Sequence, residues 1–171
     1  MEPRAQVLKS TFDIAHMVFN SVIGDLTDSQ CAYVLQGGTV PRAAAIVAHA
    51  VFGEDVVVNR MARGIEPVLQ RGGFMERTGI SAEAMGMTPE WLAMDFKIEE
   101  LRVYAAAVFA DTAAFLECAT AEMLDRTVDT PLGTKMPAAE AIGAFGIVHI
   151  SEHTGEISAL IGAQGGKGLP F

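Results

Sequence analysis

Cysteine is scarce in this sequence, and no long apolar run occurs. Two cysteines, Cys31 and Cys118, stand far apart among 171 residues, which excludes a disulfide framework and is typical of reduced thiols in a cytoplasmic protein. No apolar run approaches the roughly 18–20 residues that a membrane-spanning helix requires. The N-terminal segment MEPRAQVLKSTFDIAH has charges throughout and no apolar stretch, so a secretory signal is not expected. These absences predict a cytoplasmic protein with no membrane partner.

Positive charge is also in short supply. Twelve lysines and arginines stand against 21 aspartates and glutamates, which gives a formal net charge of −9. A surface of this sign repels polyanions, and the main basic cluster, Arg60, Arg63 and Arg71, is interrupted by Glu66 and by glycines. Nucleic acid is therefore not an expected partner, and a small-molecule substrate is.

Strand-like alternation is rare, whereas apolar residues recur at helical spacing along most of the chain. Pro41 stands where a helix can begin, and Thr88 followed by Pro89 combines a capping hydroxyl with a proline in the first turn. Gly24 and Gly64 stand where helices can end. These signals predict four long helices, over about 5–23, 41–64, 88–118 and 137–161.

The connections complete the predicted architecture. Residues 65–87 form a long glycine-containing connection, and DRTVDTPLGTKMP carries a hairpin-like turn at Pro131-Leu132-Gly133. The pattern predicts one domain over residues 1–171 with an all-α fold. We expect an antiparallel four-helix bundle with long connections and up-down-down-up helix directions.

The sequence holds four histidines, and His149 and His153 are four residues apart in the last predicted helix. Residues at this spacing lie on one helix face, so both imidazoles can reach one cation. Two interpretations stay open: partly buried core histidines with hydrogen-bond partners, or metal ligands. His49 favours the second, because it lies on the inner stripe of the second predicted helix, between Ala45 and Phe52. Three histidines from two helices leave open positions on a metal, as catalytic sites do.

Three carboxylates are candidates for supporting roles. Glu54 and Asp55 follow His49 by five and six residues, and they are either groups that support the site or solvated side chains, with solvation favoured. Glu156 follows His153 by three residues and can contact its ring. None of the three is a clear general base, so the catalytic residues stay unassigned.

Other residues have structural and functional interpretations side by side. His16 lies near the apolar stripe of the first predicted helix and is interpreted as structural or pocket-lining. Trp91 forms an apolar cluster in the sequence with Met85, Met87 and Met94. This cluster either fills the core or forms a lid over the metal, and core filling is favoured.

Two zinc-peptidase signatures can be tested against the histidine pair. HExxH fails because Ile150 stands where its glutamate is required. HxxEH matches His149 to His153 with Glu152 in place, but that signature needs a third acidic ligand far downstream, and Glu156 on the same helix is the carboxylate that follows. A peptidase is therefore not expected, and Glu152 is expected to face solvent.

The segments IVAHAVFGEDVVVNR and VHISEHTGEISALIG, with the ending QGGKGLPF, resemble the DinB-like, YfiT-related superfamily of metal-binding four-helix bundles. The sequence is most similar to actinobacterial-type members that carry HxxxHxGEI and a glycine-rich C-terminal tail. The resemblance extends over nearly the whole chain and includes TPEW at 88–91 and the segment LDRTVDTPLG.

This resemblance implies a divalent metal held by His49, His149 and His153, with waters completing its shell. Zinc or nickel is expected, with iron or manganese as further options. It also implies an enzyme that uses a low-molecular-weight thiol, mycothiol or bacillithiol, in an S-transferase reaction, and a homodimer. Two alternatives stay open: a metal-dependent hydrolase of a small molecule, because a bound metal also activates water, and a non-catalytic metal- or ligand-binding bundle.

Overall fold

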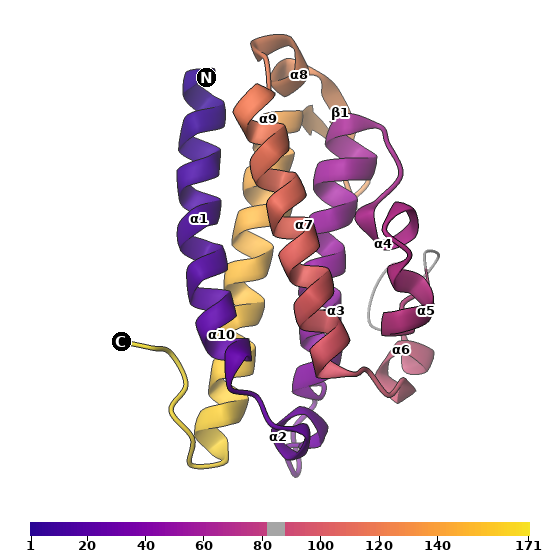
Figure 1. Ribbon diagram of the computed structural model, residues 1–171, viewed down its shortest axis with the longest axis vertical. Helices are drawn as coiled ribbons and strands as arrows, with labels where there is room; N and C mark the ends of the chain where they lie inside the picture. The colour runs from indigo at the N-terminus through magenta and orange to yellow at the C-terminus, as the bar shows by residue number, and fades with distance from the viewer. Residues whose placement is uncertain (82–87) are drawn as a thin grey trace.

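The computed structural model describes residues 1–81 and 88–171 (Figure 1). Its bundle consists of four long helical columns, each of which is a single helix or several helical segments joined end to end. The first column is α1 (Pro3–Gly24), and the third is α7 (Ile98–Cys118). The second joins α3 (Ala43–Asp55) to the π-helix η1 (Val56–Arg63), and the fourth joins α9 (Ala138–Ile142), the π-helix η2 (Gly143–Val148) and α10 (His149–Ala163). The predicted all-α four-helix bundle is confirmed.

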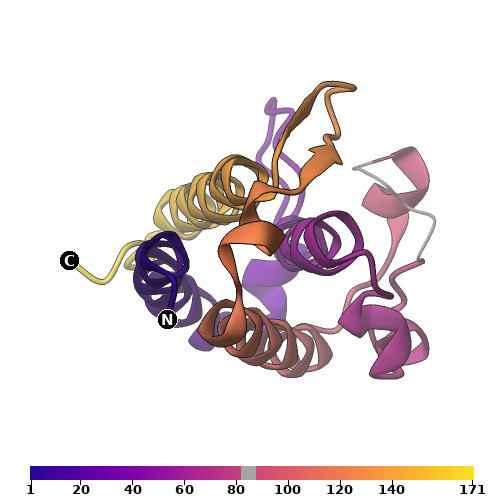
Figure 2. The ribbon, with the colours of Figure 1, turned by 90° about the horizontal axis from the view of Figure 1, so that it is seen from above.

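The helix directions follow the predicted up-down-down-up pattern. In Figure 1, α1 and α10 run from the top of the bundle to the bottom, whereas α3 and α7 run from the bottom to the top. Around the bundle, α1 contacts α7 and α10, and α3 contacts the same two helices; Figure 2 shows the four columns at the corners of a square. Because α3 and α7 are parallel, the chain between them must return along the length of the bundle, which explains the long connection.

Short elements fill the connections. They are α2 (Asp28–Ala32), α4 (Val68–Arg71), α5 (Phe74–Thr78), α6 (Pro89–Ala93), α8 (Ala121–Asp125), β1 (Thr127–Asp129) and β2 (Lys135–Pro137). The two strands pair antiparallel, so the predicted hairpin is present, and Gly133 in its turn has a φ of 73° that favours glycine. The helices α2 and α8 were not expected. Each begins with a threonine hydroxyl, of Thr27 or Thr120, that caps the first turn.

The third predicted helix is wrong at its start, because the chain breaks between α6 and α7. Thr88 does cap α6, and its hydroxyl accepts from the backbone N–H of Trp91. The helix then stops at Ala93, and the carbonyl oxygens of Leu92 and Met94 accept hydrogen bonds from the guanidinium of Arg42, both at 2.8 Å. Trp91 before the break and Phe96 after it are both buried. The break therefore lets two large aromatic side chains enter the core from a short stretch of chain.

The core fills the space between the four columns. Its largest fully buried side chains come from all four columns and from the connecting segments: Phe12, Phe19, Ile23, Ile46, Leu69, Ile80, Trp91, Leu101, Tyr104, Leu116, Leu124 and Ile142. At the end of α1, Arg102 of α7 donates to the carbonyl oxygens of Ile23 and Leu26 at 2.8 Å each, which satisfies acceptors that a helix end leaves free. None of the described helices combines the length and apolarity needed to cross a bilayer.

Asp55 is a core residue, and its interpretation as solvated is wrong. The carboxylate is fully buried and accepts from the backbone N–H groups of Val68 and Leu69 at 2.8 and 2.9 Å. It also accepts from the amide of Asn59 at 2.8 Å and from the hydroxyl of Tyr104 at 2.6 Å. Four donors replace the water that burial removes, so Asp55 fastens the start of α4 and the side of α7 to the α3–η1 column.

Candidate metal centre

Three histidines meet where α3 packs against α10. His49 comes from α3, and His149 and His153 come from α10, one helical turn apart. The Nε2 atom of His149 lies 3.1 Å from Nε2 of His49 and 3.1 Å from Nε2 of His153. One nitrogen from each ring falls within 4.8 Å of the other two. The structure thus brings together the three histidines that the sequence singled out.

The geometry of this cluster fits a metal ion. Imidazole nitrogens lie about 2.1 Å from zinc, so two ligands of one tetrahedral or octahedral ion stand roughly 3.0–3.4 Å apart. The two contacts of His149 Nε2 have this length. A ring nitrogen has one proton or one lone pair in the ring plane, so His149 Nε2 cannot form good hydrogen bonds with both neighbours. A cation between the rings satisfies all three nitrogens, and the cluster can therefore hold a metal ion.

Glu156 orients one of the three rings. Its Oε2 atom lies 2.6 Å from Nδ1 of His153, so the contact expected between these residues is present. With Nδ1–H donating to the carboxylate, the proton is on Nδ1 and the lone pair of His153 is on Nε2, facing the other histidines. Glu152, the residue before His153, is exposed as expected.

A glycine makes room for the second ring. A Cβ atom at Gly53 would lie 2.5 Å from Cε1 and 2.9 Å from Nδ1 of His149, distances that packed atoms do not tolerate. Gly53 stands one turn after His49 in the interior of α3, where glycine is normally unfavourable. The His149 imidazole therefore lies directly against the α3 backbone. Sequence reasoning missed this residue, although a helical glycine four positions after a candidate ligand is a usable signal.

Burial keeps two of the rings neutral. Loss of solvent, and after it the neighbouring His153, lower the pKa of His49 to about 4. The pKa of His149 is lowered to about 3, first by burial and then by His153 and His49. Both imidazoles are therefore unprotonated at neutral pH and have a lone pair available for a metal.

Glu54 and His16 form a buried pair elsewhere in the core. The carboxylate of Glu54 is fully buried, so its interpretation as solvated is wrong. Its Oε2 atom lies 2.8 Å from Nε2 of His16, and its Oε1 atom accepts from the hydroxyl of Thr112 at 2.7 Å. The ring of His16 stacks on Phe109 with centroids 3.6 Å apart. These contacts assign His16 a structural role that joins α1, α3 and α7.

An apolar cavity of about 390 Å³ opens beside the histidines. His49 and His149 form part of its wall. The rest of the wall comes from α3, η1, η2 and the hairpin turn: Phe52, Gly53, Val56, Val57, Phe145, Pro131 and Leu132. A small molecule bound there would touch the two histidines directly.

Trp91 lies behind His49. Its ring centroid is 6.5 Å from that of His49 and 6.2 Å from that of Phe52, and its Nε1–H donates to the carbonyl oxygen of Ala45. The side chain is almost fully buried, so for Trp91 the core interpretation holds. Met85 and Met87, which the sequence grouped with it, lie outside the described residues.

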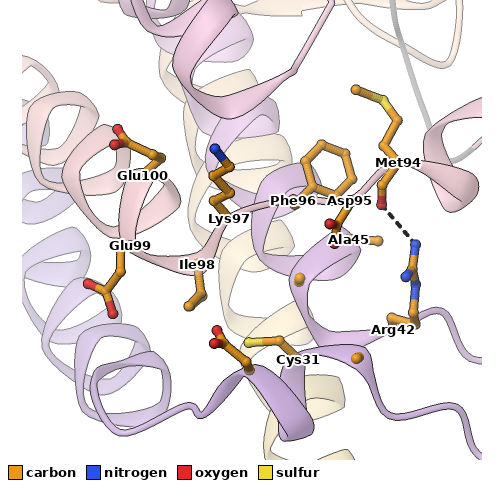
Figure 3. Close-up of a pocket in the computed structure, with 13 residues that line it drawn as sticks. Cys31, Arg42, Ala45, Met94, Asp95, Phe96, Lys97, Ile98, Glu99 and Glu100 are labelled. Carbon is orange, nitrogen blue, oxygen red and sulfur yellow. Dashed lines mark hydrogen bonds between the residues drawn. The ribbon is translucent and has the colours of Figure 1, made fainter.

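A second cavity, of about 530 Å³, lies between α2, the start of α3 and the α6–α7 connection (Figure 3). Its charged lining residues include Asp95, Lys97 and Glu99, which are exposed, and the guanidinium of Arg42, which is already bonded to the backbone at Met94. None of the three histidines lines it. The imidazole nitrogens that could bind a metal therefore lie at the smaller, apolar cavity and not at this one.

Comparison with known proteins agrees with this description. The family model of the DinB superfamily matches residues 11–157. A crystal structure described as the conserved protein of locus from Enterococcus faecalis superposes with a TM-score of 0.76 over 94% of this chain and 95% of that chain, at 18% identity. At that identity the likeness extends to the fold alone. No curated protein sequence matches the chain.

Proposed function

The chain belongs to the DinB superfamily, and from this premise we propose that it is a divalent-metal-dependent enzyme that transfers a low-molecular-weight thiol to an electrophile. One observation supports this proposal above the others. The Nε2 atom of His149 lies 3.1 Å from the Nε2 atoms of His49 and His153. The rings of His49 and His149 also form part of the wall of an apolar cavity.

The proposed reaction joins a thiol to a carbon electrophile. When bound, a divalent metal supplies the positive charge that stabilises the thiolate form of the thiol at neutral pH. The thiol sulfur forms a bond to the electrophilic carbon, the bond from that carbon to the leaving group breaks, and the leaving group departs with its electron pair. The thiol proton passes to solvent. No oxidant or reductant is required.

The residues of the site have separate roles in this proposal. His49, His149 and His153 hold the metal, and Glu156 and Gly53 act through these ligands, since one fixes the tautomer of His153 and the other leaves space for the ring of His149. The cavity walls exclude water from the electrophile, so that the thiolate rather than hydroxide reacts with it.

Hydrolysis is the weaker proposal for this site. A hydrolase gains from a carboxylate or similar base within reach of the attacking water. The described residues that line the cavity include no carboxylate, and Glu156 is already bonded to His153. A thiol has a lower pKa than water and depends less on such a base.

The three imidazole ligands limit the choice of metal but do not identify a single one. Three imidazoles accept zinc, nickel, iron and copper, and supply in the cell often decides between them. We propose zinc or nickel, with iron or manganese as alternatives, and mycothiol or bacillithiol as the thiol.

The first experiment measures metal content in protein purified without an affinity tag. We expect about one divalent ion per chain and its loss in His153→Ala. The protein is then incubated with mycothiol, bacillithiol or glutathione and a chloronitrobenzene electrophile, and the thioether is quantified. We expect conjugation that requires the metal and disappears in His49→Ala.

Four outcomes would contradict parts of this proposal. Absence of stoichiometric metal, with uptake unchanged in His153→Ala, overturns the metal centre. Conjugation that persists in His49→Ala overturns the transferase mechanism. Metal-dependent cleavage of esters or amides without thiol conjugation replaces the transferase with a hydrolase, and metal binding without any turnover leaves a binding protein.

A further inference from the structure

The cavity beside the histidines is built as two columns of side chains at helical spacing. On the α3–η1 column, His49, Gly53 and Val57 follow one another every four residues, and on the η2–α10 column Phe145 lies one turn before His149. Residues four apart lie on the same helix face. The histidines therefore occupy one end of the cavity and apolar side chains occupy the other, so a bound molecule presents one end to the histidines.

Away from the histidines, the walls of the cavity carry no charged side chain. Apart from His49 and His149, its described lining is hydrocarbon, aromatic or glycine. A charged substituent placed against these walls would lose its hydration without gaining a partner. The apolar end of the cavity therefore selects against charged groups.

The size of the cavity limits the size of its occupant. A cavity of about 150 Å³ is enough for benzene, and this one measures about 390 Å³. It therefore has room for two or three aromatic rings.

The hairpin turn supplies the outer wall. Figure 2 shows the hairpin beside the α3–η1 and α9–α10 columns, and the strand pairs hold the turn in place together with a 2.8 Å hydrogen bond between the hydroxyls of Thr130 and Thr134. Leu132 at its tip lines the cavity and yet is 76% exposed. An exposed leucine at the mouth of an apolar cavity gains burial when a ligand covers it.

We propose that this site accepts a small apolar molecule of two- to three-ring size that carries no charge on the part facing away from the histidines, and that Leu132 is a specificity-determining residue at its mouth. This inference rests on the proposed function only in naming the molecule as the electrophile. The ligand class itself follows from the volume, the apolar walls and the position of the two histidines.

Direct binding tests the inference without relying on turnover. The probe is N-phenyl-1-naphthylamine, a neutral three-ring fluorophore whose emission rises in apolar surroundings, and it is titrated into metal-free and zinc-loaded protein. The anionic 1-anilinonaphthalene-8-sulfonate serves as its charged counterpart. We expect saturable binding of the neutral probe and, in the metal-free protein, affinity for the anion weaker by about tenfold or more, which corresponds to about 1.4 kcal/mol.

Two substitutions locate the probe. Leu132→Asp is expected to weaken binding of the neutral probe about tenfold, because it places a charge at the mouth of the cavity. Leu132→Ser is expected to have a smaller effect in the same direction. Val103→Asp is the matched control, since Val103 is also an exposed apolar residue, 47% accessible, and lies on α7 outside the cavity lining. Circular dichroism verifies that each variant folds.

The outcomes separate this inference from the proposed function. Failure of the neutral probe to bind, equal affinity of the metal-free protein for the two probes, or identical effects of Leu132→Asp and Val103→Asp would each overturn the ligand class. Thiol conjugation to charged electrophiles alone would overturn it while leaving the transferase proposal intact. Binding of the neutral probe by a protein that takes up no metal would support the ligand class and refute the transferase.

Discussion

At the scale of single residues, the close approach of His149 to Gly53 has the clearest consequence. An alanine at position 53 would place its Cβ atom 2.5 Å from Cε1 of His149. The His149 ring must then move away from His49 and His153. Displacement of groups that position a metal ligand typically weakens metal affinity by about 10–100-fold. We expect Gly53→Ala to weaken zinc affinity by this factor, measured by competition with a chromophoric chelator.

Gly155→Ala is the matched control for this substitution. Gly155 also lies inside a helix that carries ligands, but a Cβ atom there meets nothing within 4 Å. Alanine in a helix interior is favoured over glycine by about 0.5–1 kcal/mol. This variant should therefore bind zinc as the wild type does and melt at a slightly higher temperature. Equal zinc affinities in the two variants would exclude the steric role of Gly53.

The neutral histidines predict how stability depends on pH in the metal-free protein. The unfolded chain takes up a proton at each histidine near pH 6.5, whereas folded His49 and His149 do so only near about pH 4 and about pH 3. Between these values the unfolded state binds more protons, so the free energy of unfolding rises with pH. The stabilisation that depends on the two neutral histidines is therefore fully present above about pH 6.5. It is lost as the pH falls through the folded pKa values of about 4 and about 3.

Thermal melting in the presence of a chelator tests this dependence between about pH 7 and about pH 5, where carboxylates titrate little. We expect the melting temperature to fall with pH in the wild type. The double variant His49→Gln/His149→Gln should lose most of that slope. A slope that is unchanged in the double variant would assign the pH dependence to other groups.

The sequence identified the three histidines and the contact of Glu156 with His153, but it missed Gly53 and misjudged the surroundings of Glu54 and Asp55. His149 and His153 were found from their spacing of four residues on one helix, and His49 from its place on the apolar face of another. Both are local patterns that can be recognised in the sequence without a structure. Glu54 and Asp55 were misjudged because their partners, Thr112, His16 and Tyr104, come from other helices. Periodicity indicates which face of its helix a carboxylate is on. It does not show which hydrogen-bond donors on neighbouring helices will contact that carboxylate in the folded protein.

At the scale of elements, the two columns that carry the histidines share an unusual feature. Each contains a π-helical segment next to its ligands: η1 begins seven residues after His49, and η2 ends immediately before His149. Such segments are rare and are often found at functional sites. The two segments also contact each other and contribute Val56, Val57 and Phe145 to the cavity wall. Widened turns in both columns therefore help to shape the cavity.

The buried carboxylate of Asp55 holds several elements in register, and this yields a stability prediction. Asp55→Ala leaves two backbone N–H groups and the hydroxyl of Tyr104 without their acceptor, and each buried unsatisfied group costs about 1–3 kcal/mol. We expect a loss of at least about 3 kcal/mol in the free energy of unfolding, measured by urea denaturation.

Asp95→Ala provides the comparison for Asp55→Ala. Asp95 is exposed, and surface substitutions of this kind usually change stability by no more than about 0.5 kcal/mol. Asp55→Asn, which keeps one acceptor oxygen, should fall between the two. A loss in Asp55→Ala no larger than that in Asp95→Ala would mean that the buried hydrogen bonds contribute nothing net.

The elements also show where prediction from sequence stops. The ends of α1 and of the α3–η1 column were predicted within a few residues, because Gly24 and Gly64 stop helices by local backbone preference. The break between α6 and α7 was missed, since it depends on Arg42, 50 residues away from the carbonyl of Leu92. Helix formers surround the break, so the local pattern predicts a continuous helix and only the tertiary contact interrupts it.

At the scale of the whole molecule, the proposed metal joins two columns of the bundle. His49 lies on α3 and the other two ligands lie on α10, so the ion binds the folded state and has no comparable site in the unfolded chain. Free zinc at 100 times its dissociation constant then adds about 2.7 kcal/mol to the free energy of unfolding. We expect the melting temperature to rise with zinc in the wild type and to stay constant in His49→Ala. A rise of equal size in that variant would place the stabilising zinc elsewhere.

The surface of α1 offers a test of the proposed homodimer. Val7, Ile14 and Met17 are apolar and more than 60% exposed, and their spacing of seven and three places them on one stripe of the helix. Packing of two such stripes, one from each copy, would remove them from water. We expect light scattering to give twice the 18.1 kDa mass of one chain and Ile14→Glu to give a single chain. Val103→Glu, at an exposed site on α7, is the control, and a monomeric wild type would overturn the proposal.

His49 and His149 are separated by 100 positions along the chain. A ribosome makes the chain from the N-terminus, so the first of these residues emerges long before its two partners exist. A growing chain that lacks α10 offers one imidazole of the three and cannot hold an ion firmly. Loading of the proposed metal would therefore wait until the last helix has docked, and occupancy of the centre would mark chains that have completed both synthesis and folding.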